Sequence, residues 1–337
     1  MTNEYHEQDG DLSVLAERTV AIIGYGNQGH AHALNLRDSG VDVIVGQRPG
    51  DSFDRAVEDG FEPVTAARAA EQADVVMLML PDETMADVYH EEVAAGVEAG
   101  DALGFCHGFN VRFGLIEPPP DVDVILVSPK GPGRHVRSEF LAGSGLFALI
   151  GVHQDVTGNA HDIALAYARG LGCLRRAAFD ATFAEETEAD LFGEQVTLCG
   201  GTTALIKASF DTLVEGGCRP EVAYFEVMHE ISLIVDLLMK GGITGMRRAI
   251  SNTAEYGDLT RGPRIIDDRT RDEMRNILEE IKSGQFAKEW IEEHKAGLPN
   301  FRRLAEKDET LLIEEVGRRI RANMGGPGPK GQDGAGD

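Results

Sequence analysis

The sequence predicts an α/β, doubly wound domain followed by an all-helical domain. The chain has 337 residues, which is long enough for two hydrophobic cores. In the first half, short apolar runs alternate with helical patterns, as in a parallel sheet covered by helices. After about Thr182 only long helical patterns remain. We therefore expect an α/β domain at 1–182, a helical domain at 183–324 and a disordered tail at 325–337.

The expected strands are short runs rich in β-branched and other apolar residues. The first begins at Thr19 with TVAII and is followed by a glycine turn, a helical stretch and a second apolar run, VDVIV, which together form a βαβ unit. Four more strands are expected, at 75–80, 102–106, 124–127 and 146–150. In the second half, stretches such as VAYFEVMHEISLIVDLLMK have the spacing of amphipathic helices.

The composition is that of a globular protein without a membrane span. Hydrophobic residues make up 42% and charged residues 26%, and no apolar run is long enough to cross a bilayer. The chain begins with acidic and polar residues rather than with a secretory signal, so we expect a cytoplasmic protein. Its cysteines lie singly, which predicts free thiols rather than a zinc site or disulfides: Cys106, Cys173, Cys199 and Cys218.

The net charge of -25 argues against nucleic acid or an anionic membrane as a partner, because both carry the same sign of charge. Only 8 of the basic residues are Lys and 24 are Arg, against 57 acidic residues. Two explanations stay open. The acidic surface suits a protein that remains hydrated in concentrated salt, and a GC-rich genome also favours Arg over Lys.

A glycine-rich turn follows the first strand and precedes the first helix. It reads GYGNQG, a GxGxxG motif, and consists of Gly24, Tyr25, Gly26, Asn27, Gln28 and Gly29. Glycine fits the tight turn and lets the backbone approach a pyrophosphate, whose charge the N-terminus of the helix stabilises. In this context between strand and helix, the motif predicts that the first domain is a Rossmann dinucleotide-binding domain.

Residues after the second strand discriminate between NADPH and NADH. Arg48 stands where a site for NAD would usually have an acid, and Ser52 adds a hydroxyl group, so both favour the 2′-phosphate of NADPH. Asp51 opposes this preference, because a carboxylate repels the phosphate but accepts hydrogen bonds from free ribose hydroxyls. NADPH is therefore the expected cofactor, and the use of NADH stays open.

Two pairs of carboxylates predict a metal site in the helical domain. Asp190 and Glu194 are four residues apart, as are Glu226 and Glu230, so each pair shares one helix face. The second face continues into Leu233, so we expect its carboxylates to point inward. Buried carboxylates repel one another unless a cation compensates them, and oxygen ligands suit Mg²⁺. Two Mg²⁺ ions are expected.

Two loops of the first domain are expected to face the cofactor. His107 follows one predicted strand and Lys130 follows the next, at the edge where doubly wound folds bind ligands. His107 could move a proton, and Lys130 could bind an oxyanion or a carboxylate. An ordinary loop histidine or lysine is an equally good interpretation of position alone.

Six motifs occur together in the order and at the spacing of one family: GYGNQGHAHALNLRDSG, FCHGFN, SPKGPG, EADLFGEQ, YFEVMHE and AISNTAEYGD. On these motifs the chain resembles the short-form (class I) ketol-acid reductoisomerases, or acetohydroxy-acid isomeroreductases, from about Thr19 to Met324. The resemblance implies Mg²⁺-dependent alkyl migration and NAD(P)H-dependent reduction of 2-acetolactate or 2-aceto-2-hydroxybutyrate. The products would be 2,3-dihydroxy-isovalerate and 2,3-dihydroxy-3-methylvalerate, in valine, isoleucine and leucine biosynthesis.

The resemblance also implies a knotted helical domain and at least a homodimer, with the active site shared between subunits. Asp190 and Glu194 of one subunit, with Glu226 and Glu230 of the other, would bind the metals. His107, Lys130 and Glu230 would act in catalysis, and Ser251 would contact the substrate carboxylate. Further cofactor contacts are implied at Asp82, Glu83, Thr84, Met85 and Gly133.

Three residues depart from the usual family pattern: Asp51, Met85 and Cys106. Only Asp51 bears on a prediction, because it weakens the preference for NADPH. Two other classes stay open from the residues alone. A metal-free β-hydroxyacid or 6-phosphogluconate-type dehydrogenase would not need four inward carboxylates, and a non-catalytic nucleotide sensor would bind the cofactor without Mg²⁺-dependent turnover.

Overall fold

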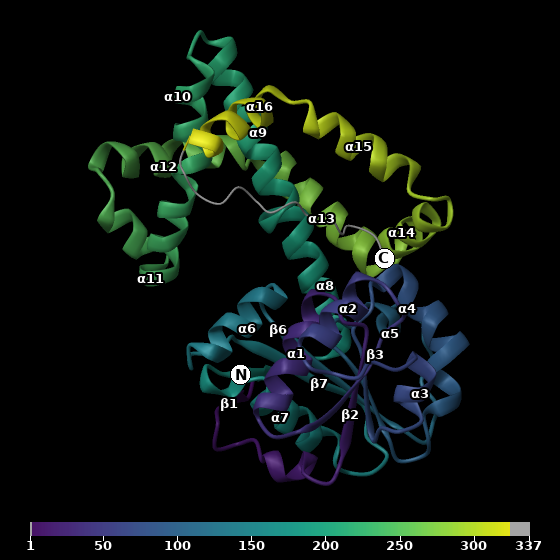
Figure 1. Ribbon diagram of the computed structural model, residues 1–337. Coiled ribbons are helices and arrows are strands. Elements are labelled where there is room, and N and C mark those ends of the chain that lie inside the picture. Colours follow the sequence, from purple (N-terminus) through teal and green to yellow (C-terminus); the bar gives the residue numbers. More distant parts are fainter. Residues whose placement is uncertain (1, 324–337) are drawn as a thin grey trace. The chain divides into compact units, whose positions relative to one another are not determined.

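The computed structural model describes residues 2–323 (Figure 1). The predicted tail at 325–337 lies outside the described residues. The chain forms two compact units that meet in sequence at Asp190 and Leu191. This division falls inside helix α8 (Phe183–Phe192), so Asp190 belongs to unit 1 and Glu194 to unit 2.

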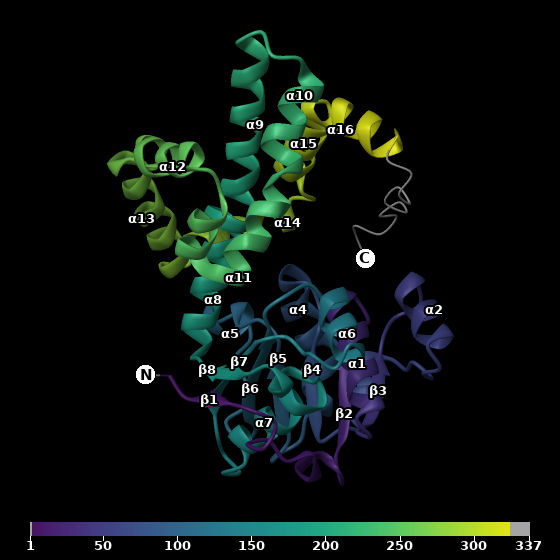
Figure 2. The same cartoon turned by 90° about the vertical axis from the view of Figure 1, so that its left-hand side faces the viewer.

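Within the described residues, unit 1 contains an eight-stranded sheet in the order β1-β8-β7-β6-β5-β4-β2-β3 (Figure 2). Its strands are β1 (Glu4–Tyr5), β2 (Thr19–Ile23), β3 (Asp42–Gly46), β4 (Val75–Leu78), β5 (Ala102–Phe105), β6 (Asp123–Pro129), β7 (Ala148–Gln154) and β8 (Ala178–Asp180). The five strands from β2 to β6 run parallel, which confirms the predicted doubly wound fold.

Two pairs at one side of the sheet are antiparallel, in contrast to the fully parallel sheet that we expected. β7 runs antiparallel to β6, and β1 runs antiparallel to β8. Helix α6 (Gly133–Leu141), which connects β6 to β7, packs against α1 (Asn27–Asp38). The connection through α6 does not bring the chain back to the end of the sheet where β6 begins. β7 therefore runs beside β6 in the opposite direction.

The sheet is buried on both faces, which explains the almost continuously apolar strands. In β2, Val20 and Ile22 pack in one core with α1 and α7 (Ala160–Gly170). Ala21 and Ile23 pack in a second core on the opposite face, with α3 (Ala66–Ala70) and α4 (Asp82–Val88). The chain passes from β2 to β3 on one side and then to β4 on the other. The carboxyl ends of β2 and β4 therefore form the switch point where such sheets bind ligands.

A histidine lies fully buried between two helices of the first core. His32 of α1 has no exposed surface, and its Nδ1 lies 2.9 Å from the hydroxyl of Tyr167 in α7. Its Nε2 has no hydrogen-bond partner. Burial lowers the pKa of His32 to about 3, because the charged imidazolium would lose its hydration.

Replacing His32 with Gln is expected to reduce the loss of stability on acidification. Between the ordinary pKa of 6.5 and the folded value of about 3, the unfolded chain binds more protons than the folded chain, so stability falls as the pH falls. From pH 6.5 to 5, His32 should account for roughly 2 kcal/mol of that loss. Denaturant unfolding at several pH values measures it, with the exposed His135→Gln as control. Equal pH slopes for the His32 variant and wild type would contradict the prediction.

Unit 2 consists of helices in the described residues, as predicted. Besides two π-helical turns, at Gly193–Leu198 and Phe225–His229, they are α9 (Gly200–Glu215), α10 (Pro220–Tyr224), α11 (Ile231–Ala249), α12 (Asn252–Ile265), α13 (Asp268–Lys282), α14 (Gln285–Lys295), α15 (Pro299–Glu309) and α16 (Leu312–Asn323). A small core joins α9, α10 and α16 through residues such as Phe210, Tyr224 and Val316. The knot stays a prediction.

Large apolar side chains of α11 and α12 lie at the surface of unit 2. Leu233, Met239 and Ile243 of α11 are 60% to 79% exposed, and Tyr256 and Leu259 of α12 are more than half exposed. A single chain thus leaves an apolar surface uncovered, which is typical of an interaction surface. Within residues 2–323, none of the helices combines the length and hydropathy that a membrane crossing requires.

Candidate active site

The candidate active site of unit 1 lies at the carboxyl ends of its parallel strands. Gly24 follows β2, Asp82 begins the helix after β4, His107 follows β5, and Lys130 follows β6. Because neighbouring parallel strands end at the same edge of a sheet, residues predicted from four separate motifs come together here.

A buried carboxylate, Glu186 of α8, binds the polar groups of this edge together. Its Oε2 accepts hydrogen bonds from Nδ1 of His107 and the backbone N–H of Gly108, both at 3.0 Å. Its Oε1 accepts from the hydroxyl of Ser128 at 2.9 Å and from Nζ of Lys130 at 2.7 Å. Glu186 is only 1% exposed. These contacts fix the loops after β5 and β6 to one helix.

Two further carboxylates border this cluster. Asp190, one helical turn after Glu186, accepts a hydrogen bond from Nζ of Lys130 at 3.0 Å, and its other oxygen lies 3.7 Å from Nδ1 of His107. On the other side of the imidazole ring, Oδ2 of Asp82 lies 4.0 Å from Nε2 of His107. Lys130 thus faces two carboxylates and His107 faces three.

The cluster strongly shifts the pKa values of its members. Burial alone would lower the pKa of His107, but the hydrogen bond to Glu186 and the nearby carboxylate charges raise it to about 9. Burial alone would raise the pKa of Glu186, but His107 and Lys130 lower it to about 2. Burial raises the pKa of Asp82 to about 6. At neutral pH the site therefore presents an imidazolium and an ammonium, both held by an ionised Glu186.

The donor set of this edge fits a hard cation at Asp190. Single ligand atoms of His107, Glu186 and Asp190 lie within 4.8 Å of one another. Glu186 is already neutralised by Lys130 and His107, and a protonated imidazole is no metal ligand. Asp190 contributes carboxylate oxygen at the border of the cluster, as Mg²⁺ prefers. Asp190 also contacts Lys130, but its side chain is 32% exposed and so remains accessible to a metal, whereas the buried Glu186 orients the basic side chains.

Sequence reasoning missed Glu186 and Ser128. Glu186 lies four residues before Asp190, so the segment EETEADLFGEQ carries three acids spaced four residues apart. That extended spacing is the signal that could have revealed it. Ser128 is the last residue but one of β6 and gave no signal beyond its position before Lys130.

The glycine-rich turn has the close backbone contacts that its motif predicts. Gly24 has a φ of 99°, a conformation that residues with a side chain rarely adopt. A Cβ atom on Gly29 would lie 1.9 Å from the carbonyl oxygen of Gly24. Gly133 lies against the same turn, since its Cβ would meet the carbonyl oxygen of Asn27 at 1.8 Å. Glycine is therefore needed at these positions for the backbone of the turn to pack this closely.

Tyr25 fixes helix α2 (Asp51–Glu58) to this turn, and we call its contacts the Tyr25 anchor. The side-chain oxygen of Gln47 accepts the backbone N–H of Tyr25 at 2.8 Å, and Arg55 donates to its carbonyl oxygen. The buried Tyr25 hydroxyl donates to Asp59 at 3.0 Å. The backbone and the side-chain hydroxyl of Tyr25 thus both hold the cofactor turn to α2.

The predicted specificity residues lie outside this anchor. Asp51 and Ser52 are the first two residues of α2, and Gly50, with a φ of 149°, precedes them. Arg48 and Asp51 are exposed, and Ser52 is half-buried. Asp51 therefore carries its charge at a helix N-terminus, the position where a phosphate would also be stabilised.

The other implied cofactor residues form the first turn of α4. Asp82, Glu83 and Thr84 are partly exposed there. Met85 is only 2% exposed, and its sulfur accepts a hydrogen bond from the side chain of Asn110 at 3.4 Å. Its side chain is therefore part of the core beneath the loop.

The predicted groups of unit 2 lie on its surface. Glu194, Glu226 and Glu230 are all exposed, and so is Leu233. The expectation that Glu226 and Glu230 point inward is therefore wrong for a single chain, because the core takes up Ala223 and Tyr224 of the preceding turn instead. The hydroxyl of Ser251 caps α12 by accepting the N–H of Ala254 at 3.2 Å.

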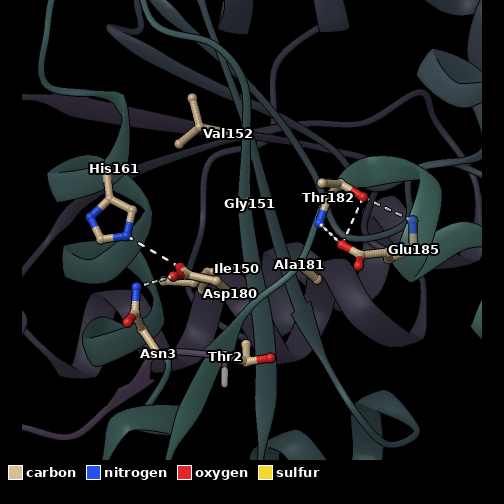
Figure 3. Close-up of a pocket in the computed structure, with 10 residues that line it drawn as sticks. All are labelled: Thr2, Asn3, Ile150, Gly151, Val152, His161, Asp180, Ala181, Thr182 and Glu185. Carbon is tan, nitrogen blue, oxygen red and sulfur yellow. Dashed lines mark hydrogen bonds and ion pairs between the residues drawn. The ribbon is translucent and has the colours of Figure 1, made fainter.

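A cavity of about 610 Å³ lies elsewhere on unit 1, beside the middle of β7 and the end of β8 (Figure 3). Figure 3 shows Asn3 and His161 directed at Asp180, and Thr182 paired with Glu185. Its polar groups thus bind one another, and it contains none of the predicted site residues. We do not assign the active site to it.

Comparisons with known proteins point to the same family for both units. Residues 14–177 match the family described as acetohydroxy acid isomeroreductase, NADPH-binding domain. Residues 183–325 match the family described as ketol-acid reductoisomerase, C-terminal domain.

Solved structures agree with these matches. An NADH-preferring ketol-acid reductoisomerase from an uncultured archean is 43% identical, with a TM-score of 0.92, and the match covers 95% of this chain and 98% of that one. A semialdehyde dehydrogenase NAD-binding protein from Cupriavidus necator is similar at 18% identity and a TM-score of 0.62, over 79% of this chain and 99% of that one. A putative oxidoreductase from Jannaschia sp. CCS1 is similar at 15% identity and a TM-score of 0.61, over 80% of this chain and 97% of that one. The latter two share only the fold.

Proposed function

Because the chain belongs to the ketol-acid reductoisomerase family and has the function of that family, we propose how its own residues carry the reaction. The single observation that supports the proposal best is the cluster around Glu186. It brings an imidazolium, an ammonium and the carboxylate of Asp190 to the sheet edge that also bears the dinucleotide turn. The substrates are 2-acetolactate and 2-aceto-2-hydroxybutyrate.

We assign the metal site to four carboxylates. Asp190 and Glu194 come from one subunit, and Glu226 and Glu230 come from its partner. Two Mg²⁺ ions held there would supply Lewis acidity to the hydroxyl and carbonyl oxygens of the substrate. Their donor chemistry supports the assignment, because carboxylate oxygen is the ligand that Mg²⁺ prefers.

The basic residues bind and orient the substrate. Lys130 and His107 donate hydrogen bonds to substrate oxygens, and Glu186 keeps both charged and fixed in direction. Glu230 accepts the proton that leaves the substrate hydroxyl during alkyl migration, and Ser251 contacts the substrate carboxylate. A dinucleotide whose pyrophosphate is held at the glycine turn would supply the hydride for the reduction of the resulting 2-keto acid.

A homodimer would cover the exposed apolar residues of α11 and α12, among them Leu233, Met239 and Tyr256. The same contact would surround Glu226 and Glu230, which are exposed in a single chain. Dimerisation thus gives these carboxylates the protected environment that a metal site needs. Sedimentation velocity measures whether the protein is a dimer in solution. A cytoplasmic location stays a prediction.

NADPH is the cofactor that Arg48 and Ser52 favour, and we propose that NADH is accepted as well. The charge of Asp51 at the N-terminus of α2 supports this, because it repels a 2′-phosphate and can bind ribose hydroxyls instead. The similar archaeal enzyme is NADH-preferring.

Replacing Asp51 with Ser is expected to shift the preference towards NADPH. The ratio of kcat/KM for NADPH to that for NADH should rise about tenfold, which corresponds to about 1.4 kcal/mol of removed repulsion. Asp54→Ser, two residues after Ser52 on the same helix, is the control. An unchanged ratio in the Asp51 variant would remove this carboxylate from the specificity site.

The experiment that tests the function is the oxidation of NADPH and NADH with 2-acetolactate, with and without Mg²⁺, at low and high salt. Turnover that needs Mg²⁺ is expected with both cofactors. Cofactor binding without turnover under any of these conditions would contradict the proposed reaction. Full activity and stability without added salt would contradict the idea that the acidic surface is an adaptation to salt.

A further inference from the structure

Wide helical turns of unit 2 coincide with the carboxylates assigned to magnesium. A π-helical turn spans Gly193–Leu198 and contains Glu194, and another spans Phe225–His229 and contains Glu226. The third such turn of the described residues, Tyr89–Val93, lies in unit 1. π-helical turns are rare and occur frequently at functional sites. Two of these three turns therefore carry candidate ligands.

The turn at Gly193–Leu198 is closed by hydrogen bonds across five residues. The N–H of Cys199 donates to the carbonyl oxygen of Glu194 at 2.9 Å, and the hydroxyl of Thr202 donates to that of Thr197. Helix α9 begins directly afterwards. Compared with a continuous α-helix, the turn contains one additional residue, which rotates Glu194 by about 100° around the helix axis relative to α9.

Two consecutive glycines make this turn sterically feasible. A Cβ atom on Gly200 would lie 2.1 Å from the carbonyl oxygen of Gln195, and one on Gly201 would lie 1.9 Å from that of Val196. Both oxygens belong to the backbone of the π-helical turn, so no flexible side chain can move aside. A residue with a side chain at either position forces the turn itself to change.

We propose that Gly200 and Gly201 are positioning residues, which set the direction of Glu194 by permitting the π-helical turn. The proposal rests on the assignment of Glu194 as a magnesium ligand. Mg²⁺ demands near-ideal octahedral geometry at short ligand distances. Rotation of Glu194 by about 100° would therefore take its carboxylate away from the ion.

The test compares Gly200→Ala and Gly201→Ala with Gly216→Ala at the opposite end of α9, where the methyl group would lie no closer than 3.3 Å to another atom. Calorimetry with Mg²⁺ alone measures metal binding to the full chain, and fluorescence titration with NADPH reports on unit 1. We expect the first two variants to bind Mg²⁺ about 10- to 100-fold more weakly than wild type. NADPH binding and the control variant should be unchanged. Wild-type Mg²⁺ affinity in folded Gly200→Ala and Gly201→Ala would overturn the proposal.

A deletion separates the direction of Glu194 from general stability. Removing Thr197 takes out the additional residue, so the methyl group of Gly200→Ala no longer meets the turn. The combined variant should therefore regain a thermal midpoint near that of wild type and still bind Mg²⁺ weakly. Restored Mg²⁺ affinity together with restored stability would overturn the proposal, because the glycines would then act on folding alone.

Glu194→Gln distinguishes the positioning role from the ligand assignment. If this variant binds Mg²⁺ like wild type, the assignment of Glu194 fails and the positioning proposal fails with it. If Glu194→Gln weakens Mg²⁺ binding while the folded glycine variants do not, only the positioning proposal fails.

Discussion

Glu186→Gln is expected to lower kcat about 100-fold or more while leaving the affinity for NADPH close to that of wild type. Glutamine keeps the size of the side chain but removes the charge that Lys130 and His107 face. The amide can accept at one end only, so one of the two basic groups loses its partner. The pKa of His107 should then fall from about 9 towards its ordinary value.

Steady-state kinetics with a direct NADPH titration checks this expectation. Glu185→Gln is the matched control, because Glu185 is the preceding residue of the same helix and its carboxylate caps Thr182 at the surface. Turnover of the Glu186 variant within about twofold of the control would contradict the central role of this carboxylate, since a lost buried partner costs several kcal/mol.

Glu226→Gln is expected to lower Mg²⁺-dependent turnover by about 100-fold or more, because it removes a negatively charged ligand from the metal site. The concentration of Mg²⁺ needed for half-maximal rate should rise. The exposed Glu215→Gln at the end of α9 controls for the loss of one negative charge from unit 2. Unchanged Mg²⁺ dependence in the Glu226 variant would exclude this residue as a ligand.

Co-expression of the Glu186 and Glu226 variants tests whether subunits share the site. In a mixed dimer, one site combines an intact Glu186 with the intact Glu226 of the partner chain, and the other site carries both substitutions. Random pairing makes half of the dimers mixed, so activity should recover to about a quarter of wild type. Activity no higher than that of either variant alone would show that each chain provides its own carboxylates.

The fold could be predicted because its signals are local. Alternate residues of β2 pack in two different cores, and this alternation is visible in five consecutive residues of the sequence. The glycine turn before α1 is likewise encoded in a few consecutive residues. The edge strand β1 and its neighbour β8 contain only two and three residues, which is too short for a pattern. The direction of β7 depends on where α6 packs. The apolar pattern of a strand does not show whether it will run parallel or antiparallel to its neighbour.

The site was predicted in part, for a similar reason. His107, Lys130 and Asp190 could be found because each lies in a short motif at a strand end or on a helix face. Glu186 binds groups 56 to 79 residues away in sequence, and the chain offers 57 acids among which it does not stand out. An amphipathic pattern also predicts an apolar face such as that of Leu233 without saying whether the same chain or a second copy covers it.

The Tyr25 anchor has a consequence for evolution and for protein engineering. Gln47, Arg55 and Asp59 hold α2 to the cofactor turn, whereas Asp51, which we propose as a specificity residue, takes no part in these contacts. An exchange at Asp51 therefore leaves the contacts of the Tyr25 anchor intact. A lineage can change its preferred reductant by selected single substitutions at such a position without first rebuilding the cofactor turn.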